Sequence, residues 1–416
     1  MKKLPFTKEQ IESLLERHKS PLYIYDELGI RNFAKDLKNA FNWVKKGGYK
    51  NYFAVKACPN PHILKILKEE GMGADCSSMA ELILAERIGL RGEEIMFTSN
   101  DTPLEEFQKA RELGAIINFD DISHLDFYLE NIGQVPELIC FRYNPGDLKE
   151  GNDIIGNPVE AKYGLTKEQL FQAYEKASKN GAKRFALHSM VVSNMLDINY
   201  HADTLKMLLE LSREIKEKLG IELEFLNIGG GLGIPYKPEE KAVDLKELSS
   251  ALESEYKNHL QKGGSAVRIV SEYGRAVTGP YGFLITKVLH RMKKYKNYIG
   301  VDASMSNLMR PALYGAYHHI TILGKEDLSA THKYDVVGSL CENNDKFAID
   351  RLLPETEPGD ILILHDAGAH GYAMGFQYNG KLRSAEFLLT QDGSFRQIRR
   401  AETLDDYFAT LDWGSI

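Results

Sequence analysis

Short apolar segments alternate with amphipathic stretches through residues 50–272, and this rhythm limits what the chain can fold into. Strands that alternate with helices form a parallel sheet, because each helix carries the chain back to the edge where the next strand begins. Eight such units in one run are typical of a (β/α)₈ barrel, which usually takes roughly 250 residues. The predicted strands are Tyr52–Val55, Ala74–Cys76, Ile95–Thr98, Ile116–Phe119, Leu138–Tyr143, Arg184–His188, Glu224–Ile228 and Val267–Glu272.

The pattern changes near Gly282, after which apolar segments follow one another without helices between them. This pattern predicts an antiparallel β-domain, which the early strand Leu22–Tyr25 can join. We therefore expect two domains, a barrel over 30–280 and a β-domain built from 1–29 and 281–416. The strands expected in its C-terminal part are Phe283–Leu289, Tyr298–Val301, Ile320–Leu323, Tyr334–Gly338, Ile361–His365 and Glu386–Leu389.

Charge and composition exclude several classes of partner. The formal net charge is -7 and no basic run stands out, so neither a nucleic-acid partner nor an anionic membrane surface is expected. No apolar run is long enough to span a membrane, and the N-terminus lacks the apolar core of a signal peptide. The four cysteines are far apart and form no Cys-x-x-Cys pair, which favours reduced thiols and a cytoplasmic location. No metal is expected, since the adjacent His318 and His319 point in different directions on a helix or strand.

Reactive residues follow several predicted barrel strands, at the end where barrel enzymes place their chemistry. Lys56 follows the first strand, where its amine is a candidate for Schiff-base formation, and His188 ends the sixth. Alone, Lys56 could extend from the barrel rim into solvent and His188 could be a structural histidine.

The last two strands add a glycine-rich turn and two charged residues. Gly229-Gly230-Gly231 follows the seventh strand, where backbone N–H groups can approach a phosphate. Glu272 and Arg275 follow the eighth, where the acid can hold a proton on a pyridine nitrogen and the arginine can bind a phosphate or carboxylate. An ordinary surface ion pair is the alternative for these two residues. Together, these four strand ends supply what pyridoxal phosphate requires.

These residues resemble the barrel-type, alanine-racemase-fold pyridoxal-phosphate decarboxylases, and most closely the diaminopimelate decarboxylases. The resemblance covers nearly the whole chain from Pro21 onward. The runs that carry it are Phe53-Ala54-Val55-Lys56-Ala57, Asp75-Cys76-Ser77-Ser78, Ile228-Gly229-Gly230-Gly231, Glu272-x-Gly274-Arg275, Arg310-Pro311-Ala312-Leu313-Tyr314, Cys341-Glu342 and Tyr378-Asn379.

The resemblance implies a role for each matched residue. Lys56 would bind the cofactor covalently, His188 would stack on its ring and Glu272 would pair with the ring nitrogen. The implied contacts to the rest of the cofactor come from Gly230, Gly231, Gly274, Arg275 and Tyr378. Related racemases carry an arginine in place of the acid, so Glu272 favours decarboxylation over racemisation.

The same resemblance implies a substrate that ends in a second amino-acid group. Arg275, Arg310 and Tyr314 would hold its distal carboxylate, and Glu342 would meet its distal ammonium. Cys341 would protonate or orient the carbanion. In relatives, Cys341 and Glu342 reach the site of the neighbouring subunit, which implies a homodimer with shared active sites. The expected reaction is decarboxylation of meso-diaminopimelate to L-lysine, the last step of lysine biosynthesis.

Several positions depart from the family pattern. His188-Ser189-Met190-Val191 replaces a His-x-Gly-Ser run, so a small contact on the phosphate side is expected to be missing. Tyr273 replaces a proline, Asn343-Asn344 replaces Ser-Gly, and His370 stands where the family has a tyrosine near the cofactor and substrate. A related substrate, such as carboxynorspermidine, a carrier-bound amino acid or a basic amino acid, is therefore an alternative. A non-catalytic pyridoxal-phosphate-binding protein is a further one, since a fold alone does not fix function.

Overall fold

The computed structural model describes residues 2–151 and 157–414, which form two compact units. The sheet unit comprises Met1–Ile30, Pro235–Glu240 and Thr278–Ile416, and the barrel unit comprises Arg31–Ile234 and Lys241–Val277. The segment 235–240 lies within the range that the sequence assigned to the barrel domain, yet it groups with the sheet unit. The reason is local, because Lys2 donates to the Pro235 carbonyl at 2.7 Å and the Tyr236 ring packs on Arg310.

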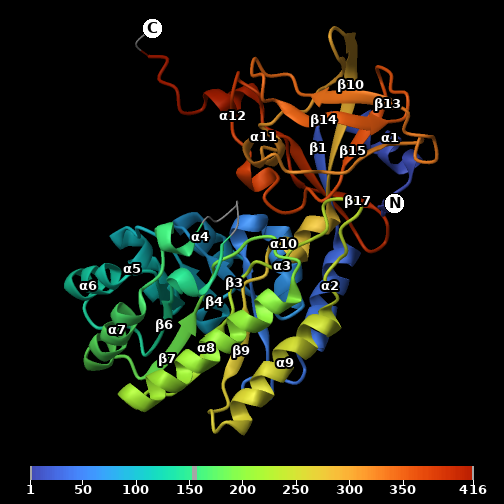
Figure 1. Ribbon diagram of the computed structural model, residues 1–416. Helices are drawn as coiled ribbons and strands as arrows, with labels where there is room; N and C mark the ends of the chain where they lie inside the picture. Colours follow the sequence, from blue (N-terminus) through green and yellow to red (C-terminus); the bar gives the residue numbers. More distant parts are fainter. Residues whose placement is uncertain (1, 152–156, 415–416) are drawn as a thin grey trace. The chain divides into compact units, whose positions relative to one another are not determined.

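The barrel unit is a closed ring of eight parallel strands with helices between them, as the sequence predicted (Figure 1). Strand β9 closes the ring by pairing with β2 at Lys50↔Val270 and Asn51↔Ser271. The strands are β2 (Lys50–Ala54), β3 (Gly73–Cys76), β4 (Ile95–Thr98), β5 (Ile116–Phe119), β6 (Leu138–Arg142), β7 (Arg184–His188), β8 (Leu223–Asn227) and β9 (Arg268–Ser271). The helices are α2 (Glu27–Ala40), which begins in the sheet unit, and α3 (Pro61–Glu69), α4 (Met79–Arg87), α5 (Leu104–Leu113), α6 (Ile122–Asn131), α7 (Lys167–Lys179), α8 (Ile198–Leu219), α9 (Leu245–Gln261) and α10 (Arg275–Thr278).

Side-chain caps explain where the longer barrel helices begin. Thr166 and Gln169 form a reciprocal capping box at the start of α7, and the side chains of Asp197 and Asp244 accept backbone N–H bonds at the starts of α8 and α9. Each cap satisfies an N–H group that has no partner within the helix. Helix α8 ends at Leu219 and is capped by Gly220, whose φ of 70° suits glycine better than any other residue.

The barrel interior is a packed layer of mostly apolar side chains, because alternate residues of each strand point inward. Below the carboxyl ends of the strands, one cluster of buried residues fills the interior. Its members are Tyr52, Met96, Ile116, Leu138, Cys140, Ala186, Phe225 and Val270. This layer closes the barrel and supports whatever lies above it.

The sheet unit contains a nine-stranded, mostly antiparallel sheet. Strand β1 (Leu22–Asp26) joins it, antiparallel to β10 and parallel to β16. The other strands are β10 (Gly282–Lys293), β11 (Asn297–Val301), β12 (Ile320–Ile322), β13 (His332–Val337), β14 (Lys346–Leu353), β15 (Ile361–Leu364), β16 (Ala385–Leu389) and β17 (Phe395–Arg399). The helices are α1 (Lys8–Arg17), α11 (Arg310–Tyr314) and α12 (Leu404–Phe408).

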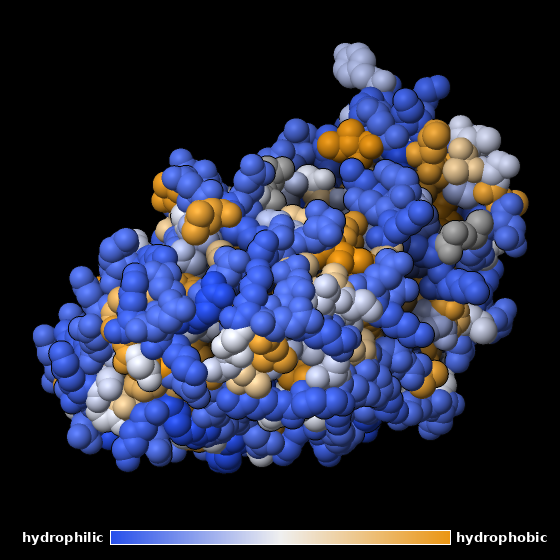
Figure 2. Space-filling view, turned by 60° about the horizontal axis from the view of Figure 1, so that its bottom comes forward, coloured by the Kyte–Doolittle hydropathy of each residue, from blue (hydrophilic) through white to orange (hydrophobic). Residues whose placement is uncertain are grey.

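Two of these strands, β14 and β17, were not predicted from the sequence. Both carry charged residues and are only partly buried, so neither shows the apolar run by which we identified the others. Strands β1, β10, β15 and β16 pack on a core that includes Leu22, Ile24 and Phe283. Among the described residues no helix is long and apolar enough to cross a membrane. The face in Figure 2 is largely hydrophilic, with hydrophobic residues in scattered groups.

Candidate active site

A ring of polar side chains lies above the apolar layer of the barrel. Side chains alternate in direction along a strand, so the residue two positions after an inward-pointing apolar residue also points inward. On most of the barrel strands that residue is polar. A polar group this deep is stable only with partners, so a ring of them indicates a site rather than a core. The ring consists of Asp75, Thr98, Asn118, Arg142, His188, Asn227 and Glu272.

His188 and Glu272 face each other within this ring. The Nε2 atom of His188 lies 3.2 Å from Oε2 of Glu272, and both side chains are buried. Asn118 Nδ2 lies 2.8 Å from Nδ1 of His188, and Asn227 donates from Nδ2 to Oε1 of Glu272 at 2.7 Å. Each amide therefore fixes the orientation of one ionisable group.

The two buried carboxyl groups of the ring have opposite protonation preferences. Burial would raise the pKa of Glu272, but the neighbouring His188 imidazole and the Asn227 hydrogen bond outweigh it, so this pKa lies below its ordinary value. Burial and the nearby charge of Glu272 raise the pKa of the Asp75 carboxyl well above its ordinary value. The surroundings thus favour the ionised form of Glu272 and the protonated form of Asp75, and carboxyls whose pKa values are pushed apart in this way are typical of catalytic sites.

Lys56 lies at the rim of this ring. It follows β2 in a short 3₁₀ turn, Val55–Ala57, and its side chain is exposed. Its positive charge lowers the pKa of both Asp75 and Glu272, so the ammonium group acts on both carboxyls. The chain after β9 lies close to this turn. A Cβ atom placed on Gly274 would be only 3.0 Å from the Cβ atom of Ala57.

The glycine-rich turn after β8 lies against the segment that follows β7. Gly231 has a φ of 85°, and a Cβ there would lie 2.8 Å from the Val192 carbonyl oxygen. Arg275, at the start of α10, donates from Nη2 to the Ser193 hydroxyl at 3.2 Å. The sequence comparison had led us to expect that a small polar contact would be missing here. Ser193 places a hydroxyl beside Arg275, five residues after His188, which makes it a candidate to replace that contact.

The residues of this site fit a planar, phosphorylated cofactor. Among the described residues, Asp75 Oδ1 and Asn118 Oδ1 are buried with no hydrogen-bond partner, and buried polar atoms of this kind call for a ligand. Arg275 offers a cation for an anionic group, and Gly230 has a backbone N–H whose partner here is only the weak acceptor Met190 Sδ, at 3.1 Å. Lys56 supplies the amine for a covalent bond.

Arg310 and Tyr314 mark the two ends of α11 in the sheet unit. The Arg310 side chain is 3 % exposed, its Nη1 lies 2.8 Å from His318 Nε2, and its guanidinium covers the Tyr236 ring at 4.4 Å. Tyr314 is exposed. The short helix thus carries a buried cation and an exposed phenol.

The other predicted residues of the sheet unit lie on loops. The exposed Cys341 donates its backbone N–H to Oδ1 of Asn379 at 2.8 Å, which brings the Cys341-Glu342 and Tyr378-Asn379 motifs together. Glu342 is half-buried and Tyr378 is exposed. His370, also half-buried, has a φ of 54° in the loop after β15.

The residues near the site that were not singled out from the sequence as site residues include Asp75, Asn118, Asn227 and Ser193. The first three have a recognisable feature in common, because each is a polar residue at an inward position near the end of an apolar barrel strand. Ser193 lies in a loop, and no pattern in the sequence marks it.

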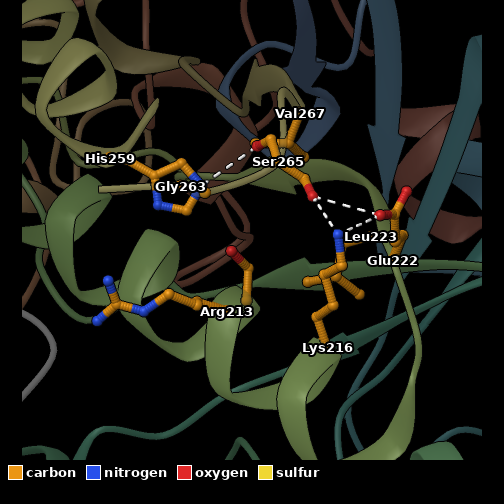
Figure 3. Close-up of a pocket in the computed structure, with 10 residues that line it drawn as sticks. Arg213, Lys216, Glu222, Leu223, His259, Gly263, Ser265 and Val267 are labelled. Atoms are coloured by element: carbon orange, nitrogen blue, oxygen red, sulfur yellow. Dashed lines mark hydrogen bonds and ion pairs between the residues drawn. The ribbon is translucent and has the colours of Figure 1, made fainter. Parts of the chain in front are cut away.

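A separate small cavity lies at the opposite, amino ends of β8 and β9 and holds none of the predicted residues (Figure 3). Its volume is about 30 Å³, and Lys216, Glu222 and Ser265 are linked across its edge. A space of this size suits a water molecule rather than a substrate. The chemistry therefore belongs to the carboxyl end of the barrel.

Comparison with known proteins agrees with this geometry. Residues 30–279 match the family described as pyridoxal-dependent decarboxylase, pyridoxal binding domain. The chain is 43% identical to Protein TabA of Pseudomonas amygdali pv. tabaci, over 97% of this chain and 94% of that protein. It is 34% identical to diaminopimelate decarboxylase of Methanothermobacter thermautotrophicus, over 94% and 92% of the two chains. The structure of diaminopimelate decarboxylase from Helicobacter pylori complexed with L-lysine has a TM-score of 0.86 and 30% identity, over 96% and 98% of the chains.

Proposed function

Because the chain belongs to the pyridoxal-dependent decarboxylases and uses pyridoxal phosphate, we propose that it removes CO₂ from meso-diaminopimelate and yields L-lysine. The name of one relative, TabA, states no substrate, so the choice of amino acid depends on the residues of this chain. The single observation that carries the proposal is the buried Glu272 carboxyl beside His188 at the barrel mouth, where its pKa lies below the ordinary value.

The barrel residues divide the work on the cofactor. Bound pyridoxal phosphate supplies an electron-withdrawing ring that stabilises the carbanion left when CO₂ departs. Glu272 holds a proton at the ring nitrogen, which its lowered pKa allows because the carboxylate is ionised. His188 supports the ring, Lys56 binds the cofactor covalently, and Gly230 and Arg275 hold its phosphate.

The sheet unit supplies charges that match the distal end of diaminopimelate. Arg310 is a buried cation and binds the distal carboxylate, while Glu342 is an anion and binds the distal ammonium. Tyr314 adds a hydroxyl at the end of α11. Cys341 would supply a proton to the substrate after CO₂ departs, and Tyr378 and His370 would complete the contacts to cofactor and substrate.

The test is the release of CO₂ and L-lysine from meso-diaminopimelate by cofactor-loaded protein, with ornithine, arginine and carboxynorspermidine in parallel. We expect turnover of diaminopimelate alone. Arg310→Gln should raise KM for diaminopimelate about tenfold to hundredfold, since a hydrogen bond to a charged group is lost. Arg291→Gln is the matched control. Arg291 lies on β10 and pairs with Glu355, with 2.9 Å between Nη1 and Oε1.

Other outcomes separate the alternatives. Turnover of another amino acid would keep the decarboxylase and replace the substrate, as the departures around Asn343 and His370 allow. A protein that binds pyridoxal phosphate but turns over nothing in the panel would contradict the proposal and leave a cofactor-binding protein.

We also propose that the enzyme is a cytoplasmic homodimer with shared active sites. The dimer rests on the resemblance of the Cys341-Glu342 motif to relatives in which it reaches a neighbouring subunit. The location rests on four cysteines that are all free thiols. Light scattering and cell fractionation test the two statements; a monomer with full turnover would contradict the shared site.

A further inference from the structure

The buried guanidinium of Arg310 depends on its neighbours for its position. A buried charge is tolerated only where hydrogen bonds and favourable contacts replace water. Arg310 Nη1 lies 2.8 Å from Nε2 of His318, and the Tyr236 ring lies under the guanidinium at 4.4 Å. The same Tyr236 ring meets His318 edge-on, with ring centroids 5.2 Å apart. Imidazole, phenol and guanidinium therefore form one packed group.

The contacts of His318 specify its protonation. A guanidinium can only donate, so Nε2 of His318 must accept from Arg310. A carbonyl oxygen can only accept, and Nδ1 lies 2.8 Å from the carbonyl oxygen of His365, so Nδ1 must carry a proton. One form of the ring satisfies both contacts, the neutral tautomer with its proton on Nδ1.

The backbone also holds His318 in place. Arg351 donates from Nη1 to the His318 carbonyl at 2.9 Å, and the His318 side chain is fully buried. A fixed, neutral imidazole gives Arg310 an acceptor without adding a second positive charge beside it.

Two further histidines, His319 and His365, lie near His318. Burial lowers the pKa of His319 to about 4 and that of His365 to about 3, so neither adds a positive charge near pH 7. No group of three His, Cys, Asp or Glu side chains that could hold a metal ion occurs in residues 2–151 and 157–414.

We propose that His318 is a positioning residue that orients Arg310 toward the carboxylate at the distal end of the substrate. This inference rests on the proposed function, since it takes Arg310 as the residue that binds this carboxylate. In particular, the uncharged acceptor Nε2 of His318 makes the site prefer a substrate whose distal end carries both an amine and a carboxylate. A substrate whose distal end carries only an amine is bound less well.

The test compares two ligands that differ only in that carboxylate, L-lysine and 1,5-diaminopentane. Their Kd values are measured on full-length, cofactor-loaded protein by calorimetry, so no turnover is required. We expect the wild type to favour L-lysine by about tenfold or more, and His318→Phe to reduce this preference by about tenfold, as for the loss of a hydrogen bond to a charged group. His318→Gln, whose amide oxygen can accept from Arg310, should retain part of it.

His319→Gln is the matched control, since it makes the same change one residue along the chain and should leave the preference at the wild-type value. Cofactor absorbance and Tm identify a variant that has failed to fold. An unchanged preference in a folded His318→Phe protein would overturn the positioning role. A wild type without the preference would instead overturn the role of Arg310, and with it the proposed substrate.

The tautomer gives a second readout that needs no ligand. In protein labelled with ¹⁵N-histidine, the His318 signals, assigned by their loss in His318→Gln, should show a protonated Nδ1 and an unprotonated Nε2 at neutral pH. A proton on Nε2 would contradict the hydrogen bond from Arg310 and overturn the proposal.

Discussion

His188 Nε2 and Glu272 Oε2 lie 3.2 Å apart at the carboxyl ends of β7 and β9, inside the barrel mouth. The contact links an imidazole and an acid that enter the site from strands far apart in the sequence. Asn227, on the strand between them, donates to the same carboxylate at 2.7 Å. These neighbours keep the pKa of Glu272 below its ordinary value although the carboxyl is buried.

Glu272→Gln should lower kcat by about a hundredfold or more, because an amide cannot hold a proton on the cofactor ring as a carboxylate does. Cofactor binding should persist through Lys56. Steady-state rates and the cofactor absorbance spectrum measure the two effects. Glu224→Gln is the control, since Glu224 lies on β8 and pairs with Arg184 at 2.6 Å. Full activity in Glu272→Gln would remove this residue from the mechanism.

The sequence predicted the eight barrel strands because each is a short apolar run bounded by turns. It did not predict β14, whose residues include Asp350 and Arg351, because that strand is half exposed and shows no apolar run. A pattern method finds a strand by what the strand buries, so strands that bury little are missed.

The site was predicted in part for a similar reason. Lys56, Glu272 and Arg275 are chemically conspicuous at the ends of strands, whereas Asn118 and Asn227 become meaningful only through what they contact. The raised pKa of Asp75 and the lowered pKa of Glu272 depend on distances between strands. The sequence supplies the residue types, and the register of the barrel decides which of them meet.

Lys56→Ala should abolish covalent attachment of the cofactor and nearly all activity, because the amine that forms the bond is removed. Mass spectrometry after borohydride reduction measures the attachment directly. Lys50→Ala is the matched control, since Lys50 begins the same strand, β2, and faces the other end of the barrel. A reduced adduct that persists in Lys56→Ala would identify a different lysine as the attachment site.

Cys341 should be the first cysteine to react with iodoacetamide. It is exposed, whereas the other three are buried, and burial raises the pKa of the Cys76 and Cys140 thiols well above the ordinary value. We expect one adduct per chain, with turnover lost in parallel and the cofactor absorbance retained. Cys341→Ala should show the same loss of turnover and resist labelling. Alkylation of Cys341 that leaves turnover unchanged would exclude it from the proton transfer.

Asp366 should make a distinct contribution to the pH dependence of stability. Burial raises its pKa to about 6 from an ordinary value of 3.8, although the charge of Lys2, its ion-pair partner, acts in the opposite direction. The folded state then binds the proton more tightly than the unfolded state. Well below pH 3.8 both states are protonated and nothing is lost. Between pH 3.8 and 6 the unfolded state ionises while the folded state keeps its proton, so stability falls over this range.

Asp366→Asn removes this titration, and asparagine tolerates the φ of 57° at this position. The free energy of unfolding of the variant, relative to that of the wild type, should therefore increase by about 3 kcal/mol between pH 4 and pH 7, as a shift of about two pKa units implies. The difference between the two proteins is the quantity to measure, by urea denaturation at each pH. His319 and His365, with lowered pKa values, titrate nearby with the opposite sign and cancel in that difference.

Lys2→Gln should extend the fall in stability to higher pH, because the cation that favours the ionised acid is gone. A difference between Asp366→Asn and wild type that stays constant across this range would mean that Asp366 is already ionised in the folded protein at pH 4.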